Sequence, residues 1–263
     1  MGIEQSTAAS TDTAAVSRFA GGLIDILDRV EYSRVHMNVT DNPIYRLRYE
    51  AYRREEFVPF NDRGIVHDDL DGTPNAFCYG IHIDGQLVSS IRIHHLTGEH
   101  RYGPSMKSCP DVLNPLLDQG QTFVDPSRFT ADYEASLAYP ALPFLTLRIA
   151  VMATEYFSAT ACLALVRPEH GPFYRRVFGA VEMCGVRSYP GLSFPVVLYG
   201  SNSAINLQQI YRRYPFFRST REEQDQIFSQ TDLRGFEIPV PTAARAALED
   251  ALRGEAGQIA AAE

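Results

Sequence analysis

The sequence predicts an α/β domain with a mixed, mostly antiparallel central sheet, flanked by helices and extended by further helices at both ends. Two apolar runs, at residues 77–83 and 87–96, meet at Asp84-Gly85, which is a strong hairpin signal. A strand, a buried helix and a buried strand then follow one another through residues 122–166, which requires one crossover connection. These observations together indicate a mixed sheet of about six or seven strands.

The first third of the chain alternates between helical and extended patterns. Apolar residues recur at helical spacing through residues 16–30, and apolar and polar residues alternate through residues 34–39. Asn42 before Pro43 is typical of a helix start, because a side-chain cap followed by proline satisfies the first turn. Residues 58–73 are rich in Pro, Asn, Asp and Gly and are expected to form a long loop.

The remaining elements follow from the same patterns. Residues 98–120 contain three prolines and are expected to form an irregular excursion. The later expected elements are a strand at 122–130 interrupted at Pro126, a helix at 144–157, a strand at 162–166, a helix at 172–178, a hairpin at 181–189 and 194–199, and helices at 205–214 and from Thr242. We therefore expect a domain at residues 16–200, a tail at 1–15 that is disordered, and a helical extension at 201–263.

Composition argues against several classes of protein. A net charge of −8 disfavours a surface for nucleic acid. The four cysteines form no C-x-x-C pair, so neither a zinc site nor a disulfide framework is expected. The first 15 residues do not resemble a signal peptide, and no apolar run reaches the roughly 18 residues of a transmembrane segment. We expect a cytoplasmic protein with reduced thiols.

Charged residues in four segments are candidates for one functional site. They are Arg48 in the helix from Pro43, Asp68 and Asp71 in the long loop, Arg92 in the second hairpin strand, and Asp125 with Arg128 in the strand at 122–130. A carboxylate can take the proton that an attacking amine must lose, and an arginine can pair with a substrate carboxylate through two hydrogen bonds. Asp125 is the candidate base.

The position of Pro126 bears on whether Asp125 and Arg128 can share a site. Strict alternation along a strand places these two side chains on opposite faces. A one-residue bulge at Pro126, where proline cannot donate to the ladder, would bring them to one face and free backbone N–H groups for an oxyanion. In the hairpin, Arg92 shares a face with Ser90 and His94, away from Ile91 and Ile93.

This ordered set resembles the motifs of the acyl-homoserine-lactone synthases and N-acyl amino acid synthases of the GNAT superfamily. The resemblance runs from Tyr45 to Tyr199 and rests on Tyr45-Arg46-Leu47-Arg48-Tyr49, the two acids three apart, Arg92 and Asp125-Pro126-Ser127-Arg128-Phe129. It implies a GNAT-like fold, catalytic roles for Asp125 and Arg128, and substrate binding by Arg48, Asp68, Asp71 and Arg92. Asp125-Pro126, where the homoserine-lactone enzymes carry Glu and a small residue, and the missing tryptophan after the first helix make S-adenosylmethionine a less favoured acceptor. Tyr-Arg-Leu-Arg-Tyr near the start and Phe173-Tyr174-Arg175-Arg176 resemble the N-acyl amino acid synthases more closely.

The resemblance also implies a fatty acyl donor carried by acyl carrier protein. Enzymes that use CoA place a glycine-rich turn after the bulged strand to hold the pyrophosphate, whereas this chain has no glycine between Gly120 and Gly171. Acyl-CoA is therefore the less favoured donor, and no tightly bound cofactor is expected. The candidates for an acyl-chain tunnel are Phe144, Leu145, Phe173 and Phe178, and those for a basic carrier-protein patch are Arg148, Arg167, Arg175 and Arg176.

Several alternatives remain open at this stage. Arg48, Asp68 and Asp71 also fit a structural ion network, and Arg148 and Glu155 fit a pair on one helix face. The histidines match no metal-ligand spacing and are expected to be packing or surface residues: His82, His94, His95 and His170. The rival functions are homoserine-lactone synthesis from S-adenosylmethionine and a non-catalytic acyl-binding module.

Overall fold

The computed structural model describes residues 23, 26–35, 42–192 and 194–229. Seven strands form one sheet in the order β1-β2-β3-β4-β5-β7-β6. All neighbours pair antiparallel except β4 and β5, which are parallel. The strands are β1 (Val30–Val35), β2 (Ala76–Ile83), β3 (Gln86–Leu96), β4 (Phe123–Ala131), β5 (Ala161–Val166), β6 (Val181–Arg187) and β7 (Val196–Asn202). The predicted mixed, mostly antiparallel sheet is confirmed.

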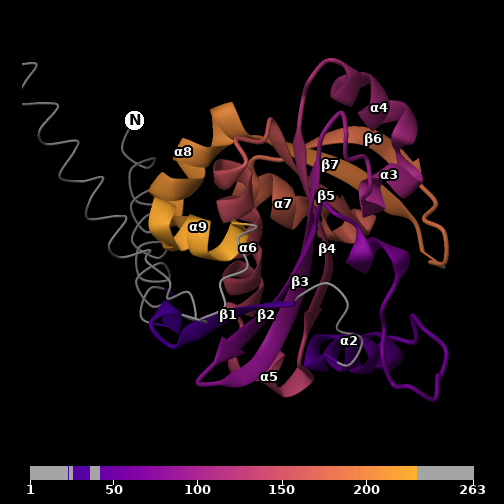
Figure 1. Ribbon diagram of the computed structural model, residues 1–263, viewed down its shortest axis with the longest axis vertical. Helices are drawn as coiled ribbons and strands as arrows, with labels where there is room; N and C mark the ends of the chain where they lie inside the picture. The colour runs from indigo at the N-terminus through magenta and orange to yellow at the C-terminus, as the bar shows by residue number, and fades with distance from the viewer. Residues whose placement is uncertain (1–22, 24–25, 36–41, 193, 230–263) are drawn as a thin grey trace, which may run out of the picture.

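Helices cover both faces of the sheet (Figure 1). One face carries α2 (Pro43–Arg54), the short 3-10 helix η1 (Asp69–Gly72), α3 (Pro104–Ser108) and α4 (Pro110–Asp118). The other carries α6 (Leu142–Tyr156), α7 (Gly171–Phe178), α8 (Ser203–Arg213), η3 (Pro215–Phe217) and α9 (Arg221–Phe228). The two remaining elements are α5 (Tyr133–Ala138) and η2 (Pro168–His170). The largest apolar core lies between the sheet and α6.

Local sequence signals account for the elements that were predicted correctly. The Asn42 side chain accepts a hydrogen bond from the Ile44 N–H and caps α2. Asp84 and Gly85 both have positive φ, at 52° and 78°, which is the conformation that a tight hairpin turn needs. Gly179 ends α7 in the left-handed conformation. The buried helix and strand expected at 144–157 and 162–166 are α6 and β5.

Two expected elements were wrong. The first strand begins at Val30 rather than Arg34, because Val30 fits both the helical spacing before it and the alternation with Tyr32 after it. Residues 98–120 are not irregular, since they contain α3 and α4. Pro104 and Pro110 open these helices at a position where a missing N–H costs nothing, so they start helices rather than break them. The predicted tail at 1–15 and the helix from Thr242 lie outside the described residues.

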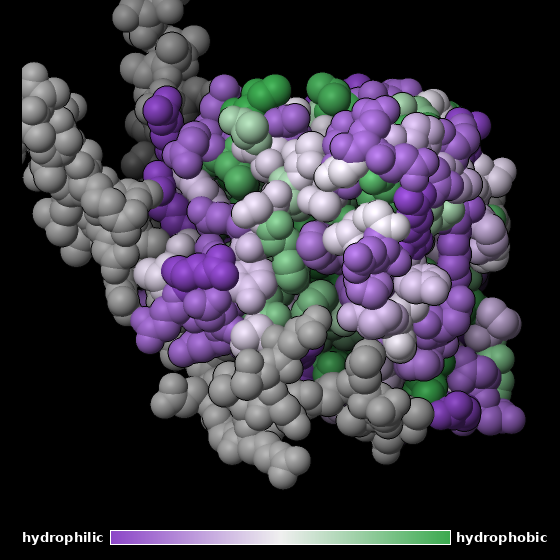
Figure 2. Space-filling view, turned by 45° about the horizontal axis from the view of Figure 1, so that its top comes forward, coloured by the Kyte–Doolittle hydropathy of each residue, from purple (hydrophilic) through white to green (hydrophobic). Residues whose placement is uncertain are grey.

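The surface mixes polar and apolar side chains. Figure 2 shows hydrophobic side chains in a band down the middle of one face, between more hydrophilic flanks. Within the described residues, no helix is both long and apolar enough to span a membrane.

Candidate active site

β4 and β5 diverge soon after they meet, and a cavity occupies the gap. Their parallel ladder contains only the pairs Phe123–Ala161 and Val124–Cys162, after which the two strands separate. The cavity has a volume of about 900 Å³. It is lined by the later residues of both strands, by Tyr52 and Pro104 from one helical layer and by Val151 and Phe173 from the other. The cavity therefore reaches from one face of the sheet to the other.

Five charged side chains form a continuous network on the α2 side. Asp71 Oδ1 lies 2.8 Å from Arg48 Nη1 and 3.0 Å from Arg92 Nη1. Asp68 pairs with Arg92 Nη1 at 2.5 Å and with Arg128. Arg92 and Arg128 line the cavity, whereas Arg48 is fully buried behind them. The structure thus joins five of the six charged residues that the sequence had set out in separate segments.

The spacing of the two acids has a local structural cause. Asp68 caps η1 by accepting from the Leu70 N–H, and the Asp71 side chain accepts from the Asp68 N–H at 2.9 Å. This reciprocal arrangement is a capping box, which fixes both carboxylates before they meet the arginines. Burial alone would raise the pKa of Asp68, but the guanidinium groups of Arg92 and Arg128 hold that pKa well below its ordinary value.

A bulge in β4 brings Arg128 to the network, although it does not lie at Pro126. Pro126 pairs in register with Ile93, and the register shift falls at Arg128 and Phe129 opposite Ile91. Arg128 has a φ of 51°, which turns its side chain toward η1. The pairing of β4 with β5 ends at Val124, before Pro126. The missing N–H of Pro126 therefore removes no hydrogen bond between these two strands.

The side chains of Asp125 and Arg128 lie on the same face of the sheet, the one covered by α2 and α3, as expected for a bulged strand. Their surroundings differ. Asp125 is fully buried and does not line the cavity. Its two carboxylate oxygens accept from the Ser105 N–H at 2.9 Å and the Ser105 hydroxyl at 2.7 Å. A Cβ on Gly103 would lie 2.7 Å from Asp125 Oδ2, so glycine is needed for this approach. Direct proton abstraction by Asp125 does not fit this geometry, and its contacts instead hold α3 on the sheet.

The burial of Asp125 gives a testable dependence of stability on pH. Burial raises the pKa of Asp125 to about 6, against the opposing effect of the Ser105 hydrogen bonds. The folded state then holds a proton more tightly than the unfolded state, so Asp125 should cost stability increasingly as the pH rises from about 4 to about 6. Relative to Asp125→Asn, the free energy of unfolding of the wild type is expected to fall by about 3 kcal/mol over that window. Denaturant titrations of both proteins at pH 4 and pH 7 measure the difference between their free energies of unfolding. If this difference is the same at both pH values, the pKa of Asp125 is not raised.

The predicted tunnel residues divide into two pairs. Phe173 and Phe178 line the cavity, whereas Phe144 and Leu145 do not. Phe144 packs behind Phe173, with ring centroids 5.6 Å apart, and Leu145 is fully buried in the core. The cavity face of α6 is another stripe at helical spacing, which sequence reasoning missed: Pro143, Leu147, Ala150, Val151 and Thr154.

The structure also divides the predicted basic patch. Arg148 is fully buried and pairs with Glu223, so it is not part of a surface patch, nor does it pair with Glu155 as expected. Glu155 instead accepts from Tyr211 at 2.8 Å and from Gln224. Arg167 lines the cavity beside Glu169, and Arg175 and Arg176 are exposed on α7.

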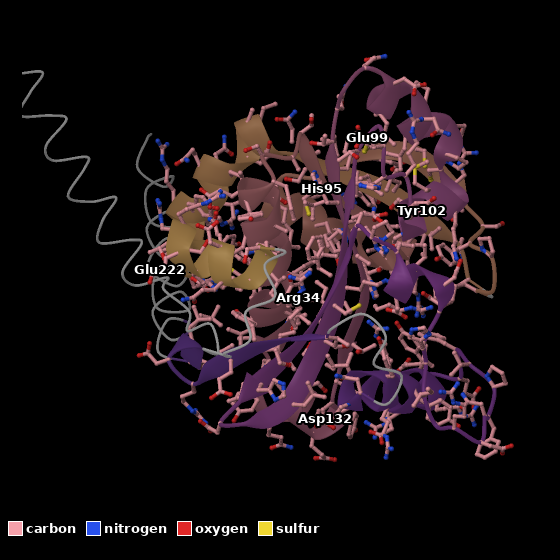
Figure 3. All side chains as sticks on the ribbon, viewed as in Figure 1. Arg34, His95, Glu99, Tyr102, Asp132 and Glu222 are labelled. Carbon is pink, nitrogen blue, oxygen red and sulfur yellow. The ribbon has the colours of Figure 1, made fainter. Side chains whose placement is uncertain are left out.

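His94 and His95 have the expected packing roles, whereas His170 lines the cavity beside Glu169. His95, labelled in Figure 3, stacks on Phe157 with ring centroids 4.3 Å apart. His94 is fully buried with its Nε2 3.0 Å from the Leu70 carbonyl oxygen, and burial lowers its pKa to about 3. The described residues hold no group of three or more His, Cys, Asp or Glu side chains placed to bind a metal.

Tyr189 is a cavity residue that no sequence signal indicated. It lies in the loop between β6 and β7 and lines the cavity beside Pro190 and Leu192. Burial raises the pKa of Tyr189, while the charges of Arg128 and Arg92 lower it, which places its hydroxyl within their field. The loop thus closes the arginine end of the cavity from the opposite half of the sheet.

The chain is similar to proteins of one family and to several solved structures. The family described as N-acyl amino acid synthase FeeM matches residues 43–202. The solved structure of FeeM from uncultured soil microbes is 13% identical, with a TM-score of 0.54, and the match covers 67% of this chain and 92% of FeeM. The AHL synthase LasI is 15% identical over 66% of this chain and 91% of LasI, with a TM-score of 0.46. An acyl-CoA N-acyltransferase from Pseudomonas aeruginosa is 18% identical over 65% and 98%, with a TM-score of 0.43. No curated protein sequence matches the chain.

Proposed function

This chain belongs to the FeeM family of N-acyl amino acid synthases, with a GNAT-like acyltransferase fold, and we propose that it transfers a fatty acyl group from acyl carrier protein to the α-amine of an amino acid. One observation supports this proposal most strongly. The cavity between β4 and β5 joins an arginine-rich end, suited to a small anion, to an apolar space suited to a fatty chain.

In this proposal Arg128 binds the carboxylate of the amino acid. Its guanidinium lines the cavity, lies 5.5 Å from the Tyr52 ring centroid, and is oriented by Asp68. Arg92 stands beside it and donates to the Ser127 hydroxyl at 3.1 Å. Asp68 and Asp71 act as positioning residues because they pair with the two arginines, and Arg48 acts through its ion pair with Asp71. None of these three residues lines the cavity.

The acyl transfer is a direct displacement at the thioester. The neutral amine attacks the carbonyl carbon, a C–N bond forms and the C–S bond breaks. The proton of the amine leaves with the departing thiolate, so that an amide and a thiol result. Beyond Val124, β4 has no β5 partner on one edge. In this proposal the carbonyl oxygen lies at that edge, where backbone N–H groups stabilise it as negative charge develops. Asp125 contributes by holding α3, whose Pro104 forms part of the cavity wall.

Two carboxylates after β4 support carrier protein, rather than CoA, as the donor. After β4 the chain enters α5, where Asp132 (Figure 3) already accepts from the Ala135 N–H as the cap. Glu134 adds a second carboxylate to this first turn. Two carboxylates at a helix N-terminus repel a pyrophosphate, and one of them occupies the N–H group that the phosphate would need.

The exposed arginines of α7 should serve the acidic carrier protein. The double variant Arg175→Glu, Arg176→Glu is expected to raise the KM for acyl carrier protein thioesters at least about tenfold at low salt, because charge complementarity speeds association. Its activity with a fatty acyl-pantetheine, which lacks the protein, should stay at the wild-type level. Arg101→Glu, on the other face of the sheet, is the control. An equal loss with both donors would contradict this docking surface.

The function itself is tested with purified protein, fatty acyl carrier protein and the common amino acids. N-acyl amino acids detected by mass spectrometry support the proposal. Release of methylthioadenosine from S-adenosylmethionine would instead indicate a homoserine-lactone synthase. Tight binding of fatty acids without turnover of any thioester would indicate a non-catalytic acyl-binding module.

A further inference from the structure

The helix α8 lies immediately beyond the part of the chain that matches the family, yet it forms part of the cavity wall. The match ends at residue 202, and α8 begins at Ser203. Ser203, Leu207 and Ile210 recur at helical spacing and all three line the cavity. Because α8 packs against α6 and α7, these side chains lie on the opposite side of the sheet from Arg92 and Arg128.

Aromatic side chains support the cavity wall at this end. Phe178 lines the cavity and packs against Phe217 of η3, with ring centroids 5.6 Å apart. Phe173 lines it and packs against Phe144, which in turn packs against Phe216 at 5.8 Å. Phe216 and Phe217 are fully buried, so closely packed side chains lie behind the cavity wall.

A buried ion pair ties this segment to the rest of the fold. Arg148 of α6 donates through Nε to the Phe216 carbonyl at 2.8 Å and through Nη2 to the Arg218 carbonyl at 2.6 Å. The same guanidinium pairs with Glu223 of α9. Figure 1 shows α8 and α9 lying beside α6. Removal of a single partner from such a pair is strongly unfavourable, so η3 and α9 hold a fixed position.

We propose that α8 forms the terminal wall of the acyl cavity and that Leu207 and Ile210 set the longest acyl chain that the protein accepts. The inference rests on the proposed function for the identity of the occupant, a saturated fatty acyl chain. The carboxyl end of the chain lies near the arginines and its methyl end meets α8. A chain that exceeds the available depth must displace these packed side chains or leave methylenes in water.

Binding of saturated fatty acids with 8 to 18 carbons tests the inference without requiring turnover. Affinity for the wild type should rise about fourfold per added methylene, since each buried CH₂ contributes about 0.8 kcal/mol, and then stop rising at a limiting length. Leu207→Ala and Ile210→Ala should move this limit to chains longer by about two carbons. Leu207→Phe should move it to shorter chains. Ile205→Ala is the matched control, because Ile205 is 64% exposed on the same helix.

The outcomes separate this inference from the proposed function. Identical limits in the wild type and all Leu207 and Ile210 variants would overturn the role of α8, even if N-acyl amino acids form. A limit that follows the size of residue 207 supports it, even if no amino acid is acylated. Where acylation occurs, the chain lengths of the products should shift in the same direction as the binding limit.

Discussion

Replacing Arg92 with methionine is expected to lower the free energy of unfolding by about 3–5 kcal/mol. The substitution removes two charge-assisted hydrogen bonds to carboxylates and leaves Asp68 and Asp71 each with one arginine partner instead of two. Arg92 is 1% exposed, and its Nη1 lies 2.5 Å from Asp68 and 3.0 Å from Asp71. Burial alone would raise the pKa values of both aspartates. Arg92 and Arg128 nevertheless hold the pKa of Asp68 below its ordinary value of 3.8. Arg48 and Arg92 do the same for Asp71. The effect of such acids on stability is present above about pH 4 and is lost as the pH falls through the lowered folded pKa.

Two comparisons separate this effect from a loss of packing. The difference between wild type and Arg92→Met in denaturant titrations should be largest above pH 5 and should shrink below about pH 4. Arg101→Met, which removes a partly exposed pair with Asp118, should cost less than about 1 kcal/mol. A loss for Arg92→Met that does not change with pH would show that the network does not depend on charge.

Replacing Arg128 with methionine is expected to lower kcat/KM for the amino acid about 100-fold, through loss of a charge-assisted, two-pronged contact with the substrate carboxylate. Arg128 is 24% exposed at the cavity, so the substitution exposes little new surface. Arg128→Lys keeps the charge without the planar fork and should fall between the wild type and the methionine variant.

The acceptor itself supplies the control for Arg128. The wild type should prefer an amino acid over the corresponding amine without a carboxylate, and Arg128→Met should lose that preference. Steady-state assays with both acceptors measure it. Equal preference in the two proteins would show that Arg128 does not bind the carboxylate, whatever its effect on the rate.

Short local sequence patterns, and the order of the charged motifs along the chain, made much of the fold and part of the site predictable. Asp84-Gly85 sets a hairpin by its own conformation, and Asn42-Pro43 starts α2. The two acids three apart proved to be a capping box, so their spacing carried structural information as well as charge. The bulge in β4 was predicted to lie at Pro126 and was found at Arg128, where the shift in register has no distinct sequence signal.

Contacts between segments that lie far apart in the chain could not be predicted from the sequence. Arg148 and Glu223 are 75 residues apart, and nothing in either local pattern indicated the pairing that made Arg148 a buried residue. Tyr189 lines the same cavity as Arg92 and Arg128, although these residues come from opposite halves of the sheet. Cys109 and Cys184, which the sequence shows as isolated, have sulfur atoms 3.1 Å apart. Each of these proximities depends on the whole topology, which short patterns do not encode.

The most direct test of the account is a mass-spectrometric search for N-acyl amino acids after incubation of the purified protein with fatty acyl carrier protein and an equimolar mixture of the common amino acids. The account predicts an amide product whose formation requires the thioester and falls sharply in Arg128→Met. Complete recovery of the intact thioester and all free amino acids, with a folded protein that still binds fatty acids, would contradict it.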